Sequence, residues 1–137
     1  MNILHISTIN EWRGGDAQML TTYNLLKDKT DLKQYILCPT GSVLAEKCEA
    51  QAIPYFTASR QSKFSFPFLK TIIKVVKDQE IDVIHVHDSN SLSLTSVAIK
   101  WLPKVKLVYS RKRNNRVKPN YFKKLVSYTF TTPSRYR

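Results

Sequence analysis

The chain has 137 residues, of which 42% are hydrophobic, and a formal net charge of +12 at pH 7. This length fits one domain, which buries roughly two-thirds of the surface of its unfolded chain, and it leaves no room for a second. Apolar residues occur in short runs that begin at Ile3, so we expect no signal peptide and no membrane-spanning helix, and we expect Cys38 and Cys48 to be reduced core thiols of a cytosolic protein.

The first segment is a predicted strand at residues 3–7, followed by a polar loop that holds two of the three glycines. Gly14 and Gly15 permit positive φ and close backbone approach, and Asp16 can cap the helix that follows, whose apolar stripe begins at Met19. A strand, a glycine turn and a helix amino terminus together form an anion-binding nest. An ordinary turn explains the glycine pair as well, because the G-x-G-x-x-G spacing of dinucleotide sites is absent.

The same alternation of strand and helix continues along the chain. Further strands are predicted at residues 34–38, 53–57, 83–87 and 106–110, and helices at 42–51, at 67–79, from about 89 to 101 and at 121–130. Such a repeat predicts the α/β class, a Rossmann-like three-layer α/β/α sandwich with a mainly parallel sheet. In the usual doubly wound order the first strand lies beside the fourth, so the glycine loop and the end of the fourth strand should meet.

The apolar run DVIHVHDS forms this fourth strand and ends in polar residues. Ligands gather at the carboxyl ends of parallel strands, so His87, Asp88 and Ser89 are candidate site residues, and the loop can also cap the next helix. His85 and His87 point to the same face, and with His5 on the neighbouring strand they would suggest a metal site. We favour packing roles for His5 and His85, and predict no metal.

The positive charge lies at the end of the chain. Residues 1–99 contain ten Lys and Arg and ten Asp and Glu, whereas residues 100–137 contain twelve Lys and Arg and no acid. A balanced body with a basic end predicts an anionic partner, such as a phosphorylated substrate, an anionic membrane surface or nucleic acid. Aromatic residues among the lysines suit nucleic acid or a membrane interface, and we favour membrane or acceptor contact over nucleic acid because the first 99 residues carry no net charge.

Three segments in order carry a resemblance to a known family: ILHISTINEWRGGDAQML, CPTGSVLAEKCEAQAIPYF, and DVIHVHDS with LVYSRKRN. They resemble the amino-terminal, acceptor-side half of family 4 glycosyltransferases, which have the GT-B fold, over residues 1–130. The resemblance implies transfer of a sugar from a nucleotide-sugar donor to a glycan or lipid-linked acceptor of the cell envelope. It implies no cofactor, and a location in the cytoplasm at the inner face of the membrane.

The resemblance also assigns roles to individual positions. Gly14 and Gly15 match the loop that lies against the donor diphosphate, and His87 matches the histidine near the reacting sugar, so it is the candidate catalytic residue. Arg111, Lys112 and Arg113 match a basic segment that contacts phosphate or acceptor.

The residues themselves add a further pair beside the glycine turn. Trp12 can stack on a ligand and Arg13 lies next to it, so both are candidate substrate-binding residues, together with Asp88 and Ser89; the alternative is that Trp12 and Arg13 are only loop residues.

The chain departs from the family because it lacks a second domain with the paired-glutamate motif that holds the nucleotide sugar. We therefore expect a truncated protein or half of a split one, with residues 1–130 as the domain and 131–137 as a disordered or aberrant tail. Transfer by the isolated chain is not expected, because the donor pocket would be incomplete.

Overall fold

The computed structural model describes residues 1–60 and 64–110 of the chain. Strands and helices alternate over these residues without a hairpin. The elements are β1 (Asn2–Ile6), α1 (Gly14–Leu26), β2 (Lys33–Pro39), α2 (Val43–Ala50), β3 (Tyr55–Ala58), α3 (Phe66–Asp78), β4 (Val83–Val86), α4 (Ser89–Ala98), the 3₁₀ helix η1 (Ile99–Trp101) and β5 (Lys106–Tyr109).

The five strands form one parallel sheet in the order β3-β2-β1-β4-β5. β1 is central and pairs with β2 on one side and β4 on the other, so that His5 lies opposite both Ile36 and His85. The predicted neighbourhood of the first and fourth strands is thus confirmed. The order reverses between β1 and β4, which makes this the switch point of a doubly wound sheet.

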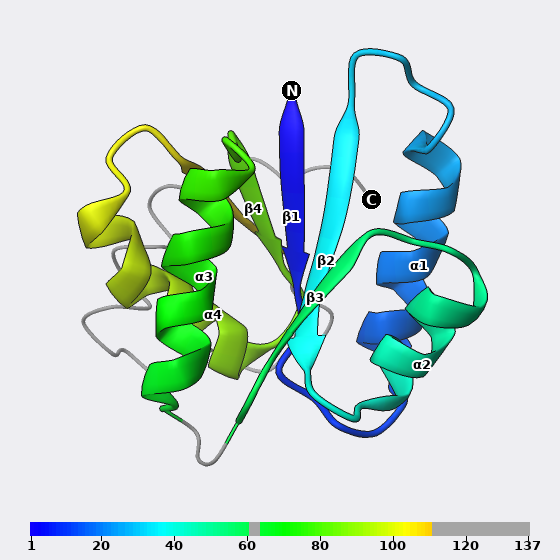
Figure 1. The fold of residues 1–137 in the computed structure, drawn as a ribbon, viewed down its shortest axis with the longest axis horizontal. Helices are drawn as coiled ribbons and strands as arrows, with labels where there is room; N and C mark the ends of the chain where they lie inside the picture. The colour runs from blue at the N-terminus through cyan, green and yellow to red at the C-terminus, as the bar shows by residue number, and fades with distance from the viewer. Residues whose placement is uncertain (61–63, 111–137) are drawn as a thin grey trace.

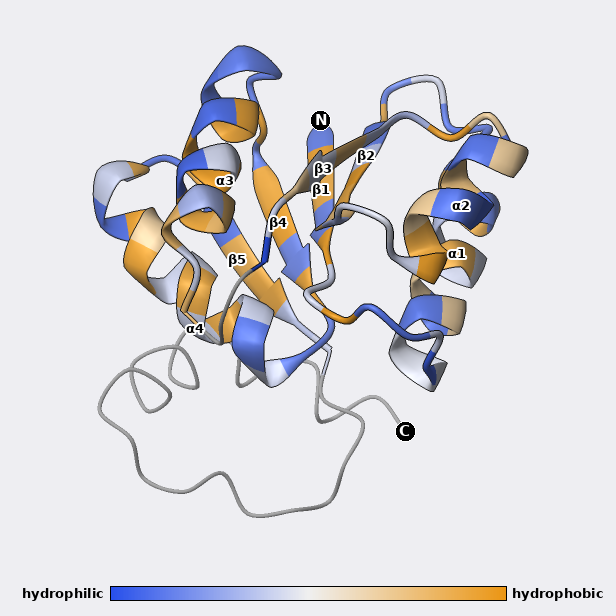
Figure 2. Ribbon diagram, turned by 60° about the horizontal axis from the view of Figure 1, so that its bottom comes forward, coloured by the Kyte–Doolittle hydropathy of each residue, from blue (hydrophilic) through white to orange (hydrophobic). Residues whose placement is uncertain are grey.

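Helices cover both faces of the sheet (Figure 1): α1 and α2 lie on one side, α3 and α4 on the other. Alternate residues of each strand serve the two layers. Leu4, Ile6 and Ile84 join the core under α3 and α4, whereas Ile36 and Cys38 join the core under α1 and α2. Figure 2 shows the largely hydrophobic strands enclosed between these layers. The predicted three-layer α/β/α sandwich is confirmed.

Helix α3 shows how the sequence pattern becomes packing. Its buried side chains include Phe68, Ile72 and Val75, spaced three or four residues apart on one face. Phe68 and Ile72 have no exposed surface, and Phe66 on the opposite face is 67% exposed. The predicted helix at 67–79 is therefore confirmed within one residue at either end.

Helix α1 begins earlier than predicted, which corrects the role of Asp16. Arg13 is the N-cap, and Gly14 and Gly15 are the first two helical residues, neither with positive φ. Asp16 is instead the third helical residue, and its Oδ2 accepts a hydrogen bond from the Arg13 amide at 3.3 Å. An acidic residue at this position can accept a hydrogen bond from the N-cap amide. This bond stabilises a first helical turn that includes both glycines.

The third strand also differs from its prediction at residues 53–57. Ala52 has a φ of 55°, and the Ile53 amide donates to the Cys48 carbonyl at 2.9 Å, which closes the end of α2. Ile53 is buried among the residues of α1 and α2, so its apolar character reflects the core and not strand pairing. β3 begins only at Tyr55.

Other boundaries are close to expectation. Ser42 caps α2, its hydroxyl accepting from the Ala45 amide at 3.2 Å, and α4 ends at Ala98, followed by η1, instead of continuing as α-helix to Trp101. No helix among the described residues is long and apolar enough to cross a membrane. The helix predicted at 121–130 and the tail at 131–137 lie outside the described residues.

Candidate functional site

The candidate site is the carboxyl edge of the sheet at the switch point between β1 and β4. From here β1 leads into the loop before α1 and β4 leads into α4, and these two helices lie on opposite faces of the sheet (Figure 1). The chain therefore diverges between two neighbouring strands, which is where open α/β sheets bind ligands.

The glycine pair and His87 meet at this edge, as predicted. A side-chain carbon added to Gly15 would lie 3.6 Å from the His87 carbonyl oxygen and 3.8 Å from its Cβ. A carbon added to Gly14 would meet nothing within 4 Å, and Gly14 is exposed. The first turn of α1 thus approaches the end of β4 at Gly15, whereas a side chain at Gly14 would project into open space beside the helix amino terminus.

Asp88 links the end of β4 to the loop after β1 through hydrogen bonds. Its Oδ2 accepts from the Thr8 amide at 3.1 Å and its Oδ1 accepts from the Thr8 hydroxyl at 2.6 Å. It also caps α4, accepting from the Ser91 amide at 2.8 Å and the Ser91 hydroxyl at 2.9 Å. Four hydrogen bonds fill the acceptor sites of a carboxylate, so the geometry gives Asp88 a positioning role, and its predicted contact with substrate stays a prediction.

A second buried carboxylate holds the start of α1. Asp16 is 2% exposed, and its Oδ1 accepts from the Ser7 hydroxyl at 2.8 Å. Burial raises the pKa of Asp16, and the hydrogen bonds from Ser7 and Arg13 offset part of this rise. Because Ser7 directly follows β1, this contact ties the start of α1, with its glycine pair, to the end of that strand.

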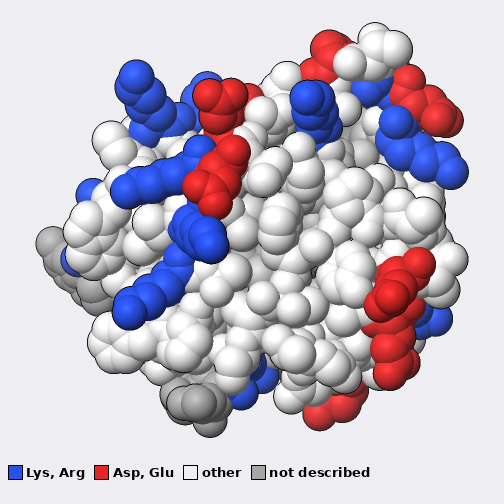
Figure 3. Space-filling model, in the orientation of Figure 1, with Lys and Arg blue, Asp and Glu red and all other residues white. Residues whose placement is uncertain are grey.

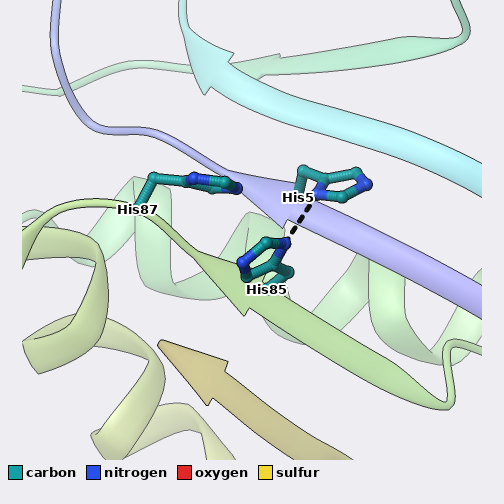
Figure 4. A group of neighbouring side chains, drawn as sticks. All are labelled: His5, His85 and His87. Carbon is teal, nitrogen blue, oxygen red and sulfur yellow. Dashed lines mark hydrogen bonds between the residues drawn. The ribbon is translucent and has the colours of Figure 1, made fainter. Parts of the chain in front are cut away.

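A hydrogen-bonded row crosses the sheet beside this edge. Gln34 on β2 contacts the His5 Nε2 atom through Oε1 at 3.0 Å, the Nδ1 atoms of His5 and His85 lie 3.2 Å apart, and His85 Nε2 lies 2.6 Å from the Ser110 hydroxyl. Figure 4 shows the pair of facing rings on β1 and β4, with His87 next to them. The ring centres of His85 and His87 are 4.0 Å apart.

The donor and acceptor roles along this row follow from the contacts of Gln34. The Gln34 amide nitrogen donates to the Tyr23 carbonyl at 3.1 Å, which leaves Oε1 to accept from His5 Nε2. His5 Nδ1 is then the acceptor for His85 Nδ1–H, and His85 Nε2 accepts from Ser110. Burial lowers the pKa of His5, and burial together with the neighbouring His5 lowers the pKa of His85 to about 4. Both rings are therefore uncharged at neutral pH.

The remaining predicted residues lie around this centre. Trp12 is 38% exposed, and Lys47 Nζ lies 4.6 Å from its ring centre, so the indole is turned toward α2. Arg13 is exposed, with a guanidinium nitrogen 3.8 Å from Glu11. Ser89 is exposed at the first turn of α4.

The basic triplet at 111–113 falls outside the described residues. The structure thus brings the glycine pair, His87 and Asp88 together, and it places Trp12 toward α2.

Sequence reasoning missed several residues that build this edge. Arg60, after β3, donates from Nη1 to the Thr8 carbonyl at 2.6 Å and so places a guanidinium beside the loop after β1. Gln34, Ser110 and Thr8 likewise make their contacts with residues far away in sequence. The one local signal was a polar Gln34 at the start of an otherwise apolar strand, where a buried polar group needs a partner.

No protein family model matches the chain. A curated relative, an uncharacterised 41.2 kDa protein of the cps region of Klebsiella pneumoniae, is 32% identical over 89 residues, which are 65% of this chain and 23% of that protein. The chain thus spans about a quarter of the length of this relative.

Solved structures have a similar fold at low sequence identity. HepE of Anabaena, in complex with UDP and glucose, matches with a TM-score of 0.61 and 17% identity over 80% of this chain and 29% of HepE. MurG of Acinetobacter baumannii matches with a TM-score of 0.67 and 12% identity over 94% of this chain and 39% of MurG. A glycosyltransferase of Rickettsia africae matches with a TM-score of 0.63 and 19% identity over 90% of this chain and 32% of that protein. The chain therefore has the Rossmann-like α/β fold found in part of each of these proteins.

Proposed function

We propose that the chain is the acceptor-side domain of a glycosyltransferase of the family 4 type, and that the carboxyl edge of β1 and β4 forms one wall of its nucleotide-sugar site. The observation that carries the proposal is the contact of Gly15 with His87 at the switch point. It occurs in a fold shared with HepE, which was solved in complex with UDP and glucose.

The chemistry of glycosyl transfer suits this edge. Negative charge builds on the departing diphosphate while the sugar becomes oxocarbenium-like, so backbone N–H groups and arginines near that oxygen lower the barrier. The amino terminus of the 13-residue helix α1, which is the positive end of the helix dipole, would favour this negative charge. Arg13 and Arg60 add positive charge at the same edge, whereas the carboxylates of Asp16 and Asp88 are occupied by hydrogen bonds within the protein.

In this proposal His87 orients the hydroxyls of the sugar or the acceptor at the end of β4. Trp12, Arg13 and Ser89 are exposed, and the proposal keeps them as substrate-binding residues. The acceptor is a glycan or a lipid-linked sugar, which the basic segment that begins with Arg111, Lys112 and Arg113 would contact at the cytoplasmic face of the membrane. Because the chain spans about a third of each solved structure, the rest of the donor site would come from another domain.

The other function considered from the sequence is a basic module for membrane or nucleic acid without catalysis. It depends on residues 111–137, which lie outside the described residues. On the face seen in Figure 3, lysines and arginines are interspersed with acids. On this face the described residues form no purely positive surface that would bind a nucleic-acid phosphate backbone. We therefore keep the transferase domain as the proposal.

The test is UDP binding by the 137-residue chain, followed by amide NMR. We expect affinity no better than roughly millimolar, because part of the donor contacts is missing, with shifts confined to residues 12–16 and 87–89. Gly14→Val should abolish these shifts, since its side chain would fill the open space at the helix terminus without a clash in the fold.

Gln18→Ala, an exposed change one turn further along α1, is the matched control and should bind UDP as the original chain does. Shifts that appear only elsewhere, or equal binding by Gly14→Val, would refute the donor-site proposal. The purified chain is also expected to give no sugar transfer from UDP-glucose.

A further inference from the structure

The three histidines of the chain all lie in one cluster, although they come from two strands and the loop after the second. His5 is on β1, His85 is opposite it on β4, and His87 follows β4 on the same face (Figure 4). One ring nitrogen from each histidine lies within 4.8 Å of the other two. We propose that His5, His85 and His87 form a binding site for a zinc ion.

The two inner ligands are already at the required separation. Zinc binds imidazole nitrogen at about 2.0–2.1 Å, so two nitrogens of a tetrahedral site lie about 3.3 Å apart. The His5 and His85 Nδ1 atoms are 3.2 Å apart and face one another across the sheet. The register of β1 and β4 fixes this pair, because the two residues are direct Cα partners. A ring nitrogen of His87 lies within 4.8 Å of both ligand atoms and is the third ligand of the proposed site.

The outer nitrogens have partners that orient the rings. Metal-bound histidines usually donate their other N–H to a carbonyl, a carboxylate or a similar group, which fixes the tautomer and the ring plane. His5 Nε2 donates to Gln34 Oε1 at 3.0 Å, and it keeps this bond when Nδ1 binds metal. His85 Nε2 lies 2.6 Å from Ser110 Oγ. When zinc takes His85 Nδ1, the ring proton moves to Nε2, which then donates to that hydroxyl, so neither ring gains or loses a proton.

The environment favours a nitrogen-only site. Cys38 on β2 and Cys48 on α2 lie in the core on the α2 side of the sheet, and burial raises the pKa of both thiols, to about 11 and about 12, so neither is a thiolate at neutral pH. Three imidazoles with one position left for water or a ligand oxygen are a set that zinc accepts. The sequence favoured packing for His5 and His85; the assembled geometry is the reason to propose metal binding instead.

The test uses untagged, chelator-washed protein, with zinc measured by competition against a chromophoric chelator and Co²⁺ used as a visible probe. We expect one zinc per chain, a tetrahedral Co²⁺ spectrum that zinc displaces, and no response to Mg²⁺, which prefers oxygen ligands. His87→Asn should weaken zinc binding at least tenfold. Ser110→Ala, which removes only the partner of His85, should weaken it by about 10–100-fold.

Cys48→Ala is the control and should leave zinc affinity unchanged. Imidazole ¹⁵N NMR of the unaltered chain gives an answer that does not depend on the folding of any variant, since three histidines give three assignable rings. Zinc must shift the nitrogens of all three together. No shift at millimolar zinc, a shift of only one ring, or binding lost with Cys48→Ala and kept in His87→Asn would overturn the site. His87 belongs to both proposals, so UDP binding is measured on the metal-free chain, where failure of the donor site and failure of the zinc site give separate readouts.

Discussion

Asp88 joins three parts of the fold, the loop after β1, the end of β4 and the start of α4, and its replacement by alanine offers a direct test of the site's construction. The change removes an N-cap, which contributes about 1 kcal/mol, from α4. It also removes two charge-assisted hydrogen bonds to Thr8, each worth about 1.5 kcal/mol or more. Because these groups are only part-buried, we expect a total loss of about 3 kcal/mol.

The assay is urea unfolding followed by far-UV circular dichroism. At a slope of about 1–3 kcal/mol per molar, a loss of this size lowers the midpoint by about 1 M or more without a change in slope. A domain of ordinary stability, about 5–15 kcal/mol, remains folded. Ser89→Ala, an exposed change at the next residue, is the matched control and should stay within about 0.5 kcal/mol of the original chain.

A double-mutant cycle isolates the link between the strands. Thr8→Val keeps the shape and the amide of Thr8 but removes the hydroxyl that donates to Asp88 at 2.6 Å. The two changes together should be less damaging than their sum by about 1–2 kcal/mol, since they remove one shared bond. Additivity within about 0.5 kcal/mol, or a loss below about 1 kcal/mol for Asp88→Ala alone, would refute the stabilising link between Asp88 and Thr8.

Two further predictions concern the core and the second carboxylate. Phe68→Ala, at a fully buried position of α3, should destabilise the domain by about 3–5 kcal/mol, whereas Phe66→Ala on the exposed face of the same helix should cost less than about 1 kcal/mol; equal losses in urea unfolding would contradict the assigned faces. Burial raises the pKa of Asp16, so the folded state binds its proton more readily than the unfolded chain, and stability should fall as pH rises from the usual Asp range through the raised pKa. Asp16→Asn removes this titration, so the free energy of unfolding of the original chain relative to the variant should decline as the pH rises above the usual Asp range, and a rise there would disprove the assignment.

The fold class, and the edge of the sheet where the candidate site lies, could be predicted from local sequence patterns. The helical spacing of Phe68, Ile72 and Val75 and the short apolar runs between helices are local patterns, and each local pattern has one way to bury its apolar face. Together they require a parallel sheet covered on both sides, and the doubly wound order then brings the glycine pair to His87.

The polar contacts between distant segments could not be predicted in this way. Asp88 reaches Thr8 across 80 positions of sequence, and the facing nitrogens of His5 and His85 are separated by the same number. These contacts depend on which residues of neighbouring strands face one another, and the paired strands are far apart in the sequence. The start of α1 differs from its predicted position for the same reason. Asp16 accepts a hydrogen bond from the hydroxyl of Ser7, which follows β1, and the helix includes both glycines.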